Sequence, residues 1–313
     1  MEHTTLLSCR LGRTMIQMSD CIGFRFEKER YTPYTRLTGQ WYLPYETDLN
    51  ELVTVQFAID GKVIHFGFPV SAEIIKKDGR SVLKLISNGY SAALTTNQCP
   101  DGLITDVDLT TLVKSVSFSL PNVTYQQNTP VANYVNYYDG TSLWEGIVCY
   151  SLRVGGKHYP YISGTNLVRI EPPEDKNTLV IPSSELISQS YNTDYTRLVS
   201  MITMSDIDGT PGVYVRTNTA APQRSIVKCR EISFDRQWIM SPDDGLKYKL
   251  NYAAREMAAD SFTFPGFHNV DIIDRLTVDG AGFNGEVDRL VITGDPTRGI
   301  CTSIWCYHDR YCN

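Results

Sequence analysis

Residues 52–94 read LVTVQFAIDGKVIHFGFPVSAEIIKKDGRSVLKLISNGYSAAL, and this stretch decides the fold class. Val55, Phe57 and Ile59 alternate with other residues, which is the two-residue period of a strand with one buried face. Asp60-Gly61 then supplies the positive-φ positions of a tight hairpin turn. A second Asp-Gly turn follows, and the chain returns through another apolar run. Hairpins this regular, with no long helix between them, predict an antiparallel sheet or barrel.

Working outward from this stretch, the chain divides into three parts. Residues 1–100 read as strands of an antiparallel sheet or barrel. Residues 101–172 mix helices with short strands and predict a small α+β insertion. Residues 173–313 begin with a linker, continue through an amphipathic helix and end in strands. The expected fold is therefore mainly β, with a helix-containing part between two strand-rich parts.

Helix caps and turns support this division. Asp108 and Ser142 (or its neighbour Thr141) precede apolar residues at helical spacing and are candidate caps of two helices in the insertion. Ser241 is the candidate cap of the amphipathic helix, with proline at its first turn. Further on, VDIIDRLTVDG, GEVDRLVITGD and ICTSIWC predict three closing strands.

Composition limits the possible functions. The chain has 313 residues, of which 42% are hydrophobic and 20% charged, and this is ordinary for a soluble protein with two or three domains. The net charge is −6 with no basic stripe, so specific nucleic-acid binding is not expected. Neither a secretory leader nor a run of roughly 20 apolar residues is visible, so we expect assembly in a cytoplasm and no membrane segment.

The closing residues 301–313, CTSIWCYHDRYCN, raise the possibility of a metal site. Zinc needs four ligands that converge on one point. In an extended strand Cys301 and Cys306 point to opposite faces, whereas Cys306 and His308 share one. Convergence with Cys312 would need a sharp bend, so the pattern favours a closing strand with a polar tail. A catalytic thiol would need a nearby base, and the sequence singles out no Cys–His pair.

The remaining candidate sites also have structural interpretations. Asp206-x-Asp208-Gly209 matches half of a calcium loop but lacks the glutamate that completes it, so a tight turn is expected. Trp41 and its tyrosine neighbours could stack on a sugar, although their strand context favours core or interface. The chain lacks the phosphate-binding, zinc-protease and nucleophile-elbow motifs. No catalytic, cofactor-binding or metal-binding residue is predicted, and the protein is not expected to be an enzyme.

The order of elements resembles a known family. The hairpin at 55–67, the charged helix in FDRQWIMSPDDGLKYKLNYAAREMAAD, the following PGF…VDIIDRLTVD and the final GEVDRLVITGDPTRGICTSIWC resemble the baseplate hub proteins of contractile phage tails and phage-tail-like bacteriocins. Related families are the late-control proteins of temperate phages and the base of type VI secretion spikes. The resemblance covers most of the chain.

This resemblance implies a structural role in a virion or phage-tail-like particle assembled in the bacterial host. It implies two antiparallel β-barrel hub domains, the first in residues 1–100 and the second in residues 173–313, with the helix-containing domain of residues 101–172 between them. It also implies a homotrimer in which the two barrels of each chain form a pseudo-six-fold ring between tail tube and central spike. The implied partners are the tube protein, the spike, the tape-measure protein and the baseplate wedge. A mildly acidic chain would suit a lumen that must not bind passing DNA through its phosphates.

Two alternatives stay open at this level. A receptor- or glycan-binding tail protein would also be β-rich and trimeric, with aromatic residues gathered on loops at one end. An enzyme would use Cys306 and His308, or another Cys–His pair.

Overall fold

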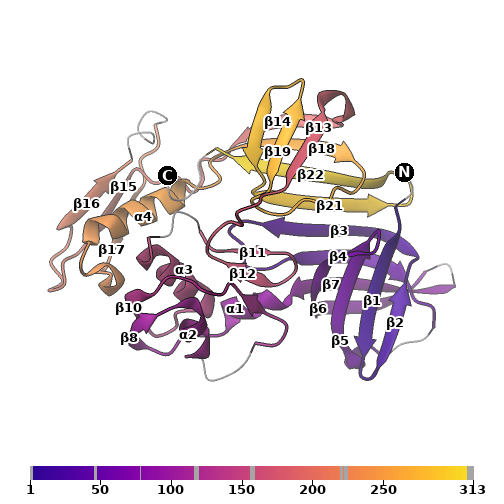
Figure 1. Ribbon diagram of the computed structural model, residues 1–313, viewed down its shortest axis with the longest axis horizontal. Coiled ribbons are helices and arrows are strands. Elements are labelled where there is room, and N and C mark those ends of the chain that lie inside the picture. The colour runs from indigo at the N-terminus through magenta and orange to yellow at the C-terminus, as the bar shows by residue number, and fades with distance from the viewer. Residues whose placement is uncertain are drawn as a thin grey trace.

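The computed structural model describes residues 3–45, 48–77, 79–115, 120–155, 159–218, 221 and 225–308. The fold is mainly β, as predicted, and an eleven-stranded sheet runs through the molecule in the order β14-β18-β22-β21-β3-β4-β7-β6-β5-β1-β2 (Figure 1). Its strands are β1 (Thr5–Leu11), β2 (Thr14–Met18), β3 (Cys21–Glu29), β4 (Arg36–Tyr42), β5 (Leu52–Ile59), β6 (Lys62–Lys77), β7 (Arg80–Gly89), β14 (Ser188–Thr193), β18 (Ala258–Pro265), β21 (Arg289–Asp295) and β22 (Gly299–Tyr307).

The stretch from 52 to 94 folds into consecutive antiparallel strands, as its pattern predicts. Asp60 and Gly61 have φ of 50° and 75° and form the turn between β5 and β6. Strand β6 is long and changes partner near its middle. It pairs with β5 as far as Gly67 and with β7 from Gly67 onward. A Cβ at Gly67 would lie 2.0 Å from the carbonyl oxygen of Asn88, so this crossing requires glycine.

The two ends of the chain meet in one sheet. Strand β21 pairs antiparallel with β3, from Arg289 opposite Glu29 to Gly294 opposite Phe24. The sheet has two ends, at β14 and β2, so the described residues form no closed barrel. The predicted pair of closed barrels is therefore not seen, because the strands of the two halves extend one another instead of closing separately.

The large sheet has two halves that meet where β3 pairs with β21. In the sheet order, the first half runs from β3 to β2 and the second from β21 to β14. Each half encloses apolar side chains. In the first half the sheet curls, and the ring of Phe57 on β5 lies 4.8 Å from Phe24 on β3. The second half is backed by a separate three-stranded sheet, and Phe262 on β18 lies 4.6 Å from Phe283. That sheet consists of β13 (Thr178–Pro182), β19 (Arg275–Asp279) and β20 (Phe283–Glu286). Both halves contribute to one continuous hydrophobic cluster.

The helix-containing part has its own core. Asp108 caps α2 through the backbone N–H of Thr111, and Ser142 forms a capping box with Glu145 at the start of α3, as predicted. Val116, predicted to continue the first of these helices, lies outside the described residues. The elements are α1 (Ala93–Thr96), α2 (Leu109–Lys114), α3 (Leu143–Arg153), β8 (Gly102–Val107), β9 (Thr124–Tyr125), β10 (Ala132–Tyr137), β11 (Tyr161–Ser163) and β12 (Leu167–Arg169).

A third cluster forms where α4 (Pro242–Ala254) packs on a small sheet, with Leu246 fully buried. Ser241 is the N-cap residue of α4 and proline follows it in the first turn, as predicted, but the Ser241 side chain makes no capping hydrogen bond. Its carbonyl oxygen accepts the first hydrogen bonds of the helix, from the backbone N–H groups of Asp244 and Gly245. The sheet strands are β15 (Met201–Met204), β16 (Tyr214–Thr217) and β17 (Cys229–Ile232).

The closing region contains four strands, β19 to β22, where three were expected. The first predicted strand begins late, because Asp274 accepts the backbone N–H of Asp271 and holds residues 271–274 in a turn. The second is divided, since Val287 and Asp288 interrupt the run between β20 and β21. The division into residues 1–100, 101–172 and 173–313 remains a prediction.

Candidate assembly site

Eight consecutive strands, from β14 to β6, separate their side chains onto two faces. The core face carries large apolar residues such as Phe26, Ile292 and Ile304, all at most 2% exposed. The opposite face, here called the polar face, carries mostly hydroxyl, amide and charged groups. One cross-strand row runs over all eight strands through Ser188, Thr263, Ser303, Val291, Glu27, Arg36, Asn88 and Phe68.

Hydroxyl groups line the polar face near β14. The hydroxyl oxygens of Ser190 and Ser261 lie 2.7 Å apart, and those of Thr263 and Ser303 lie 2.9 Å apart. These pairs bridge β14 to β18 and β18 to β22, respectively. Such hydroxyl pairs satisfy one another while leaving the face open to water.

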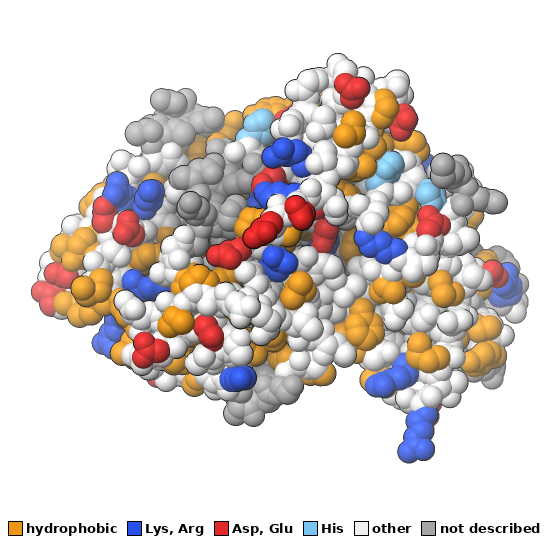
Figure 2. Space-filling view, viewed as in Figure 1, with side chains coloured by type: hydrophobic (Ala, Val, Ile, Leu, Met, Phe, Trp, Pro, Cys, Tyr) orange, Lys and Arg blue, Asp and Glu red, His pale blue; other side chains and the backbone are white. Residues whose placement is uncertain are grey.

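Charges of both signs alternate over the rest of the polar face. Arg25 and Arg289 both pair with Glu27, and Lys84 pairs with Glu73. Burial raises the pKa of Glu27, but hydrogen bonds and attraction from the two arginines outweigh this and lower it below its usual value. The face is thus nearly balanced in charge, in contrast to the acidic lumen expected from the chain as a whole. Figure 2 draws one side of the whole molecule, and there too basic and acidic side chains are interspersed.

Both ends of this eight-stranded face are free. Strand β14 pairs with β18 alone, and the part of β6 beyond Gly67 pairs with β7 alone among the described strands. Apolar side chains lie exposed next to both edges. Ile187 and Tyr191 are 57% and 59% exposed at β14, and Val70 and Ile75 are 54% and 37% exposed on β6. Unpaired edges with exposed apolar residues are sites of strand pairing with another chain.

The internal junction between β3 and β21, here called the seam, is built differently. Arg30 follows β3 and forms an ion pair with Asp288 just before β21, and these side chains are 3% and 0% exposed. Asp288 also accepts the backbone N–H of Tyr307 at 2.6 Å, and Arg30 reaches Glu286 at 3.3 Å. Buried charges of this kind stay in place only when each is paired and hydrogen bonded.

The closing strand resolves part of the metal question. Cys306 is buried in the main core, whereas Cys301 lies opposite Thr293 on the polar face, as strand alternation predicts. The Nε2 atom of His308 lies 2.7 Å from a carboxylate oxygen of Asp260. Cys312 lies outside the described residues. Within the residues placed by the structure, no three histidine, cysteine or acidic side chains are grouped to hold a metal ion.

Buried thiols and a buried imidazole have pKa values that oppose nucleophilic chemistry. Burial raises the pKa of Cys9 and of Cys149 to about 12, and that of Cys21 to about 11. Such thiols remain protonated at neutral pH and act as small apolar groups. Burial lowers the pKa of His65 to about 3, and its ring is held between Thr35 and Ser87.

The other candidates have structural roles. Trp41 is fully buried in the core, as favoured by its strand context, and Tyr42 lies under the guanidinium of Arg80 at 3.7 Å. Asp206 and Asp208 form a tight turn in which the Asp208 side chain accepts the backbone N–H of Thr210 at 2.8 Å. The sequence did not identify which strands form the free edges, because an edge strand differs from a central strand only in lacking a neighbour on one side.

Comparison by sequence finds no relative. No protein-family model matches the chain, and no curated protein matches it. The described helices include none that is long and apolar enough to cross a membrane.

Comparison of structures identifies the fold. The tail protein from Neisseria meningitidis matches with a TM-score of 0.72 over 100% of this chain and 98% of that chain, at 14% identity. The 43 kDa tail protein of prophage MuSo2 from Shewanella oneidensis matches with a TM-score of 0.69 over 97% and 98%, at 11% identity. A type VI secretion component from E. coli, described as structurally similar to two bacteriophage T4 tail proteins, matches with 0.55 over 94% and 75%, at 8% identity.

These matches span nearly the whole of the first two structures. They establish that this chain has the fold of phage tail proteins, which confirms, at the level of fold, the resemblance to tail baseplate and hub proteins inferred from sequence. At such low identities a shared fold does not by itself carry function.

Proposed function

We propose that this protein is a structural hub subunit of a phage tail or phage-tail-like particle. Three copies form a ring around a lumen, and this ring joins the tail tube to the central spike. The observation that carries the proposal is the continuous polar face of eight strands with a free edge at each end. Such a face has the form of a wall segment that is completed by its neighbours.

Ring closure follows from the two edges. The edge of β6 belongs to the first half of the sheet and the edge of β14 to the second, so pairing β6 of one copy with β14 of the next repeats the arrangement at the seam. This contact is head-to-tail, and a head-to-tail contact gives a ring when its rotation closes. Three copies, each with two half-sheets, make a wall with six similar units.

The third exposed strand, β2, is a less suitable partner. In the sheet order it follows β5 and β1, outside the eight strands of the polar face, and its side chains Ile16 and Met18 belong to the main core. Pairing through β2 would leave the polar face interrupted, whereas pairing through β6 continues it. The closure through β6 and β14 is therefore the version we propose.

The surroundings of the ring follow from this role. The polar face lines the lumen, where its nearly balanced charge gives passing DNA no cluster of cations to bind. The first and third parts of the chain supply the ring, and residues 101–172 form the inserted domain. Tube, spike, tape-measure and wedge proteins are its proposed neighbours in a particle assembled in the bacterial host.

The mass of the purified protein in solution tests the proposal. Light scattering should give three times the chain mass of 35.3 kDa, unchanged by a chelator. If the protein is a monomer alone, the same measurement with tail tube protein should give the trimer. A stable dimer, or a monomer that tube protein leaves unchanged, would contradict the ring.

No described feature favours the glycan-binding alternative. Trp41 and Trp144 are buried, Trp305 lies beneath Arg289, and Trp238 stacks on Tyr248. Trp144 belongs to the hydrophobic cluster of the helix-containing part, against which Trp305 and Tyr248 also pack, so these rings take part in packing within the chain.

A further inference from the structure

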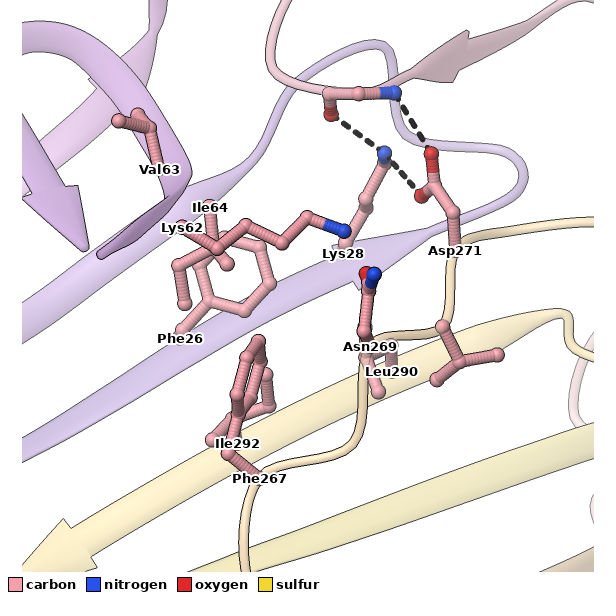
Figure 3. A pocket seen from close by; sticks show the side chains of 12 residues that line it. Phe26, Lys28, Lys62, Val63, Ile64, Phe267, Asn269, Asp271, Leu290 and Ile292 are labelled. Carbon is pink, nitrogen blue, oxygen red and sulfur yellow. Dashed lines mark hydrogen bonds and ion pairs between the residues drawn. The ribbon is translucent and has the colours of Figure 1, made fainter. Parts of the chain in front are cut away.

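A small pocket lies on the core-face side of the seam, away from the polar face. Its floor is formed by Phe26 of β3 and by Leu290 and Ile292 of β21. The start of β6 closes one side, and the segment from Phe267 to Asp271 closes the other (Figure 3). The pocket therefore lies where the two halves of the sheet and the insertion meet.

Its volume of about 50 Å³ suits one small side chain. A cavity needs on the order of 10–15 Å³ to hold one water molecule, so this pocket has room for a few non-hydrogen atoms. Pockets for drug-sized ligands or cofactors are several times larger. The lining is mostly apolar, which favours an aliphatic group over a polar one.

Two lysines border the pocket, and only one of them is neutralised. Lys28 is 4% exposed, pairs with Asp271 and donates to the carbonyl oxygen of Gly164 at 2.6 Å. Asp271 in turn accepts the backbone N–H of Gly164 at 2.7 Å. Lys28 is thus fully engaged in holding the seam to the insertion.

Lys62 has no such partner. Its side chain extends over Phe26 and Ile64, and its ammonium group points toward the pair formed by Lys28 and Asp271 (Figure 3). Its ammonium group makes no hydrogen bond or ion pair with any residue that the structure describes. Lys62 is exposed to solvent, and the partial burial of its ammonium group lowers its pKa. Asp271 opposes this shift, Lys28 adds to it, and Asp274 opposes it. An incoming carboxylate would reverse this shift.

We propose that this pocket, here called the Lys62 pocket, binds a short segment of a partner protein in which an aliphatic side chain adjoins a carboxylate. The side chain enters between Phe26 and Ile292, and the carboxylate pairs with Lys62. The carboxylate belongs either to the C-terminus of the segment or to an adjacent acidic residue. Because the pocket lies behind the polar face, the partner approaches the hub from outside the lumen.

Small probes test this chemistry directly on the full-length chain. N-acetyl-L-leucine carries an aliphatic side chain beside a free carboxylate, and N-acetyl-L-leucinamide is the matched neutral compound. Titration is followed by NMR of labelled isoleucine methyl groups, with Ile64 and Ile292 as reporters. We expect saturable shifts of both reporters with millimolar affinity for the acid, as befits a ligand of this size, and at least tenfold weaker binding of the amide.

Substitutions of Lys62 test whether its ammonium group binds the carboxylate of the probe. Lys62→Gln should reduce binding of the acid to the level of the amide, and Lys62→Arg should restore most of it. Lys247→Gln, which removes an exposed lysine on α4, is the matched control and should bind like the wild type. Equal affinity of acid and amide, or loss of binding in the control as well, would overturn the proposal.

A third probe, N-acetyl-aspartyl-leucinamide, separates the two carboxylate sources. Binding of this probe supports an internal acidic segment, and binding of N-acetyl-L-leucine alone supports a C-terminal residue. Absence of saturable shifts at Ile64 and Ile292 with every probe overturns the proposal. The readout does not require a trimer, so its failure is distinguishable from failure of the proposed ring.

Discussion

The seam and the free edges are two ends of the same half-sheets, but they have different chemistry. At the seam, β3 and β21 pair through their backbones, and the buried ion pair of Arg30 with Asp288 stabilises the junction. At the free edges, β6 beyond Gly67 and β14 pair on one side only among the described strands, and they expose apolar residues such as Val70 and Tyr191. The chain completes its own junction, and the ring that we propose leaves the equivalent contact to another copy.

In the proposed ring this difference separates folding from assembly. The seam and its buried ion pair lie within one chain, and removing either partner of a buried ion pair is strongly destabilising. An exposed apolar edge is tolerated in a monomer and is a site for pairing with another chain.

The largest effect is expected from breaking the seam. Asp288→Ala leaves the buried guanidinium of Arg30 without its main partner, and this should lower the free energy of unfolding by about 3–5 kcal/mol. Urea denaturation measures the loss. Asp20→Ala removes a carboxylate that pairs with Arg80 at the surface, where the side chains are 62% and 54% exposed, and serves as the control. Its cost should be about 0–1 kcal/mol, and equal losses would refute the special role of the seam.

A smaller loss is expected where β6 leaves β5 and becomes a free edge. In Gly67→Ala the new Cβ would meet the Asn88 carbonyl oxygen at 2.0 Å, and overpacking of this kind costs about 1–3 kcal/mol. Gly23→Ala is the matched control on β3, because its nearest contact is Gly294 at an ordinary 3.5 Å. Thermal unfolding of both variants should rank Gly67→Ala well below Gly23→Ala, and similar midpoints would contradict the crossing geometry.

Acid should weaken the first half of the sheet, where His65 is buried. Burial lowers its pKa from 6.5 to about 3, so between these values the unfolded chain binds a proton that the folded chain does not. Stability therefore falls as pH decreases through this window, by about 2 kcal/mol at pH 5 for this group.

Substitutions of His65 and of its neighbour Thr35 isolate the contribution of this imidazole to the loss of stability in acid. His65→Gln should show a shallower loss of stability between pH 7 and pH 5 than the wild type, as measured by denaturant unfolding at each pH. Thr35→Val loses the hydrogen bond to the same ring but keeps the imidazole, so its pH slope should match the wild type. An unchanged slope in His65→Gln would mean that other groups dominate the acid response.

The smallest effect on stability should accompany the largest effect on assembly. Ile75→Lys on β6 and Tyr191→Lys on β14 change exposed side chains, so each should alter the free energy of unfolding by about 0.5 kcal/mol or less. Each should convert the trimer to a monomer, as measured by light scattering. Met15→Lys, at an equally exposed position on β2, should remain trimeric. Dissociation of Met15→Lys alone would move ring closure to β2.

Local patterns predicted much of the fold. The alternation of Val55, Phe57 and Ile59 and the Asp-Gly turn specified consecutive antiparallel strands, and the caps Asp108 and Ser142 marked two helix starts correctly. These features depend on near neighbours, because side-chain period and capping are set within a few residues. Ser241 likewise marked the start of α4, although its side chain makes no capping hydrogen bond.

The candidate site was not visible in the same way. Arg30 and Asp288 are far apart in the chain, and nothing local marks them as partners. Lys62 begins β6 directly after the hairpin turn, and only the approach of the segment around Asp271 makes it the border of a pocket.

The sequence by itself determined that the chain is built of antiparallel strands, which side chains share a face, and that the known catalytic motifs are absent. Only the tertiary structure decided which strands are neighbours, and hence where the sheet is joined and where it ends. The physical reason is that strand periodicity is a property of one segment, whereas an edge is a property of a pair. Backbone groups that remain unpaired after the chain has folded are defined by what the whole fold leaves uncovered.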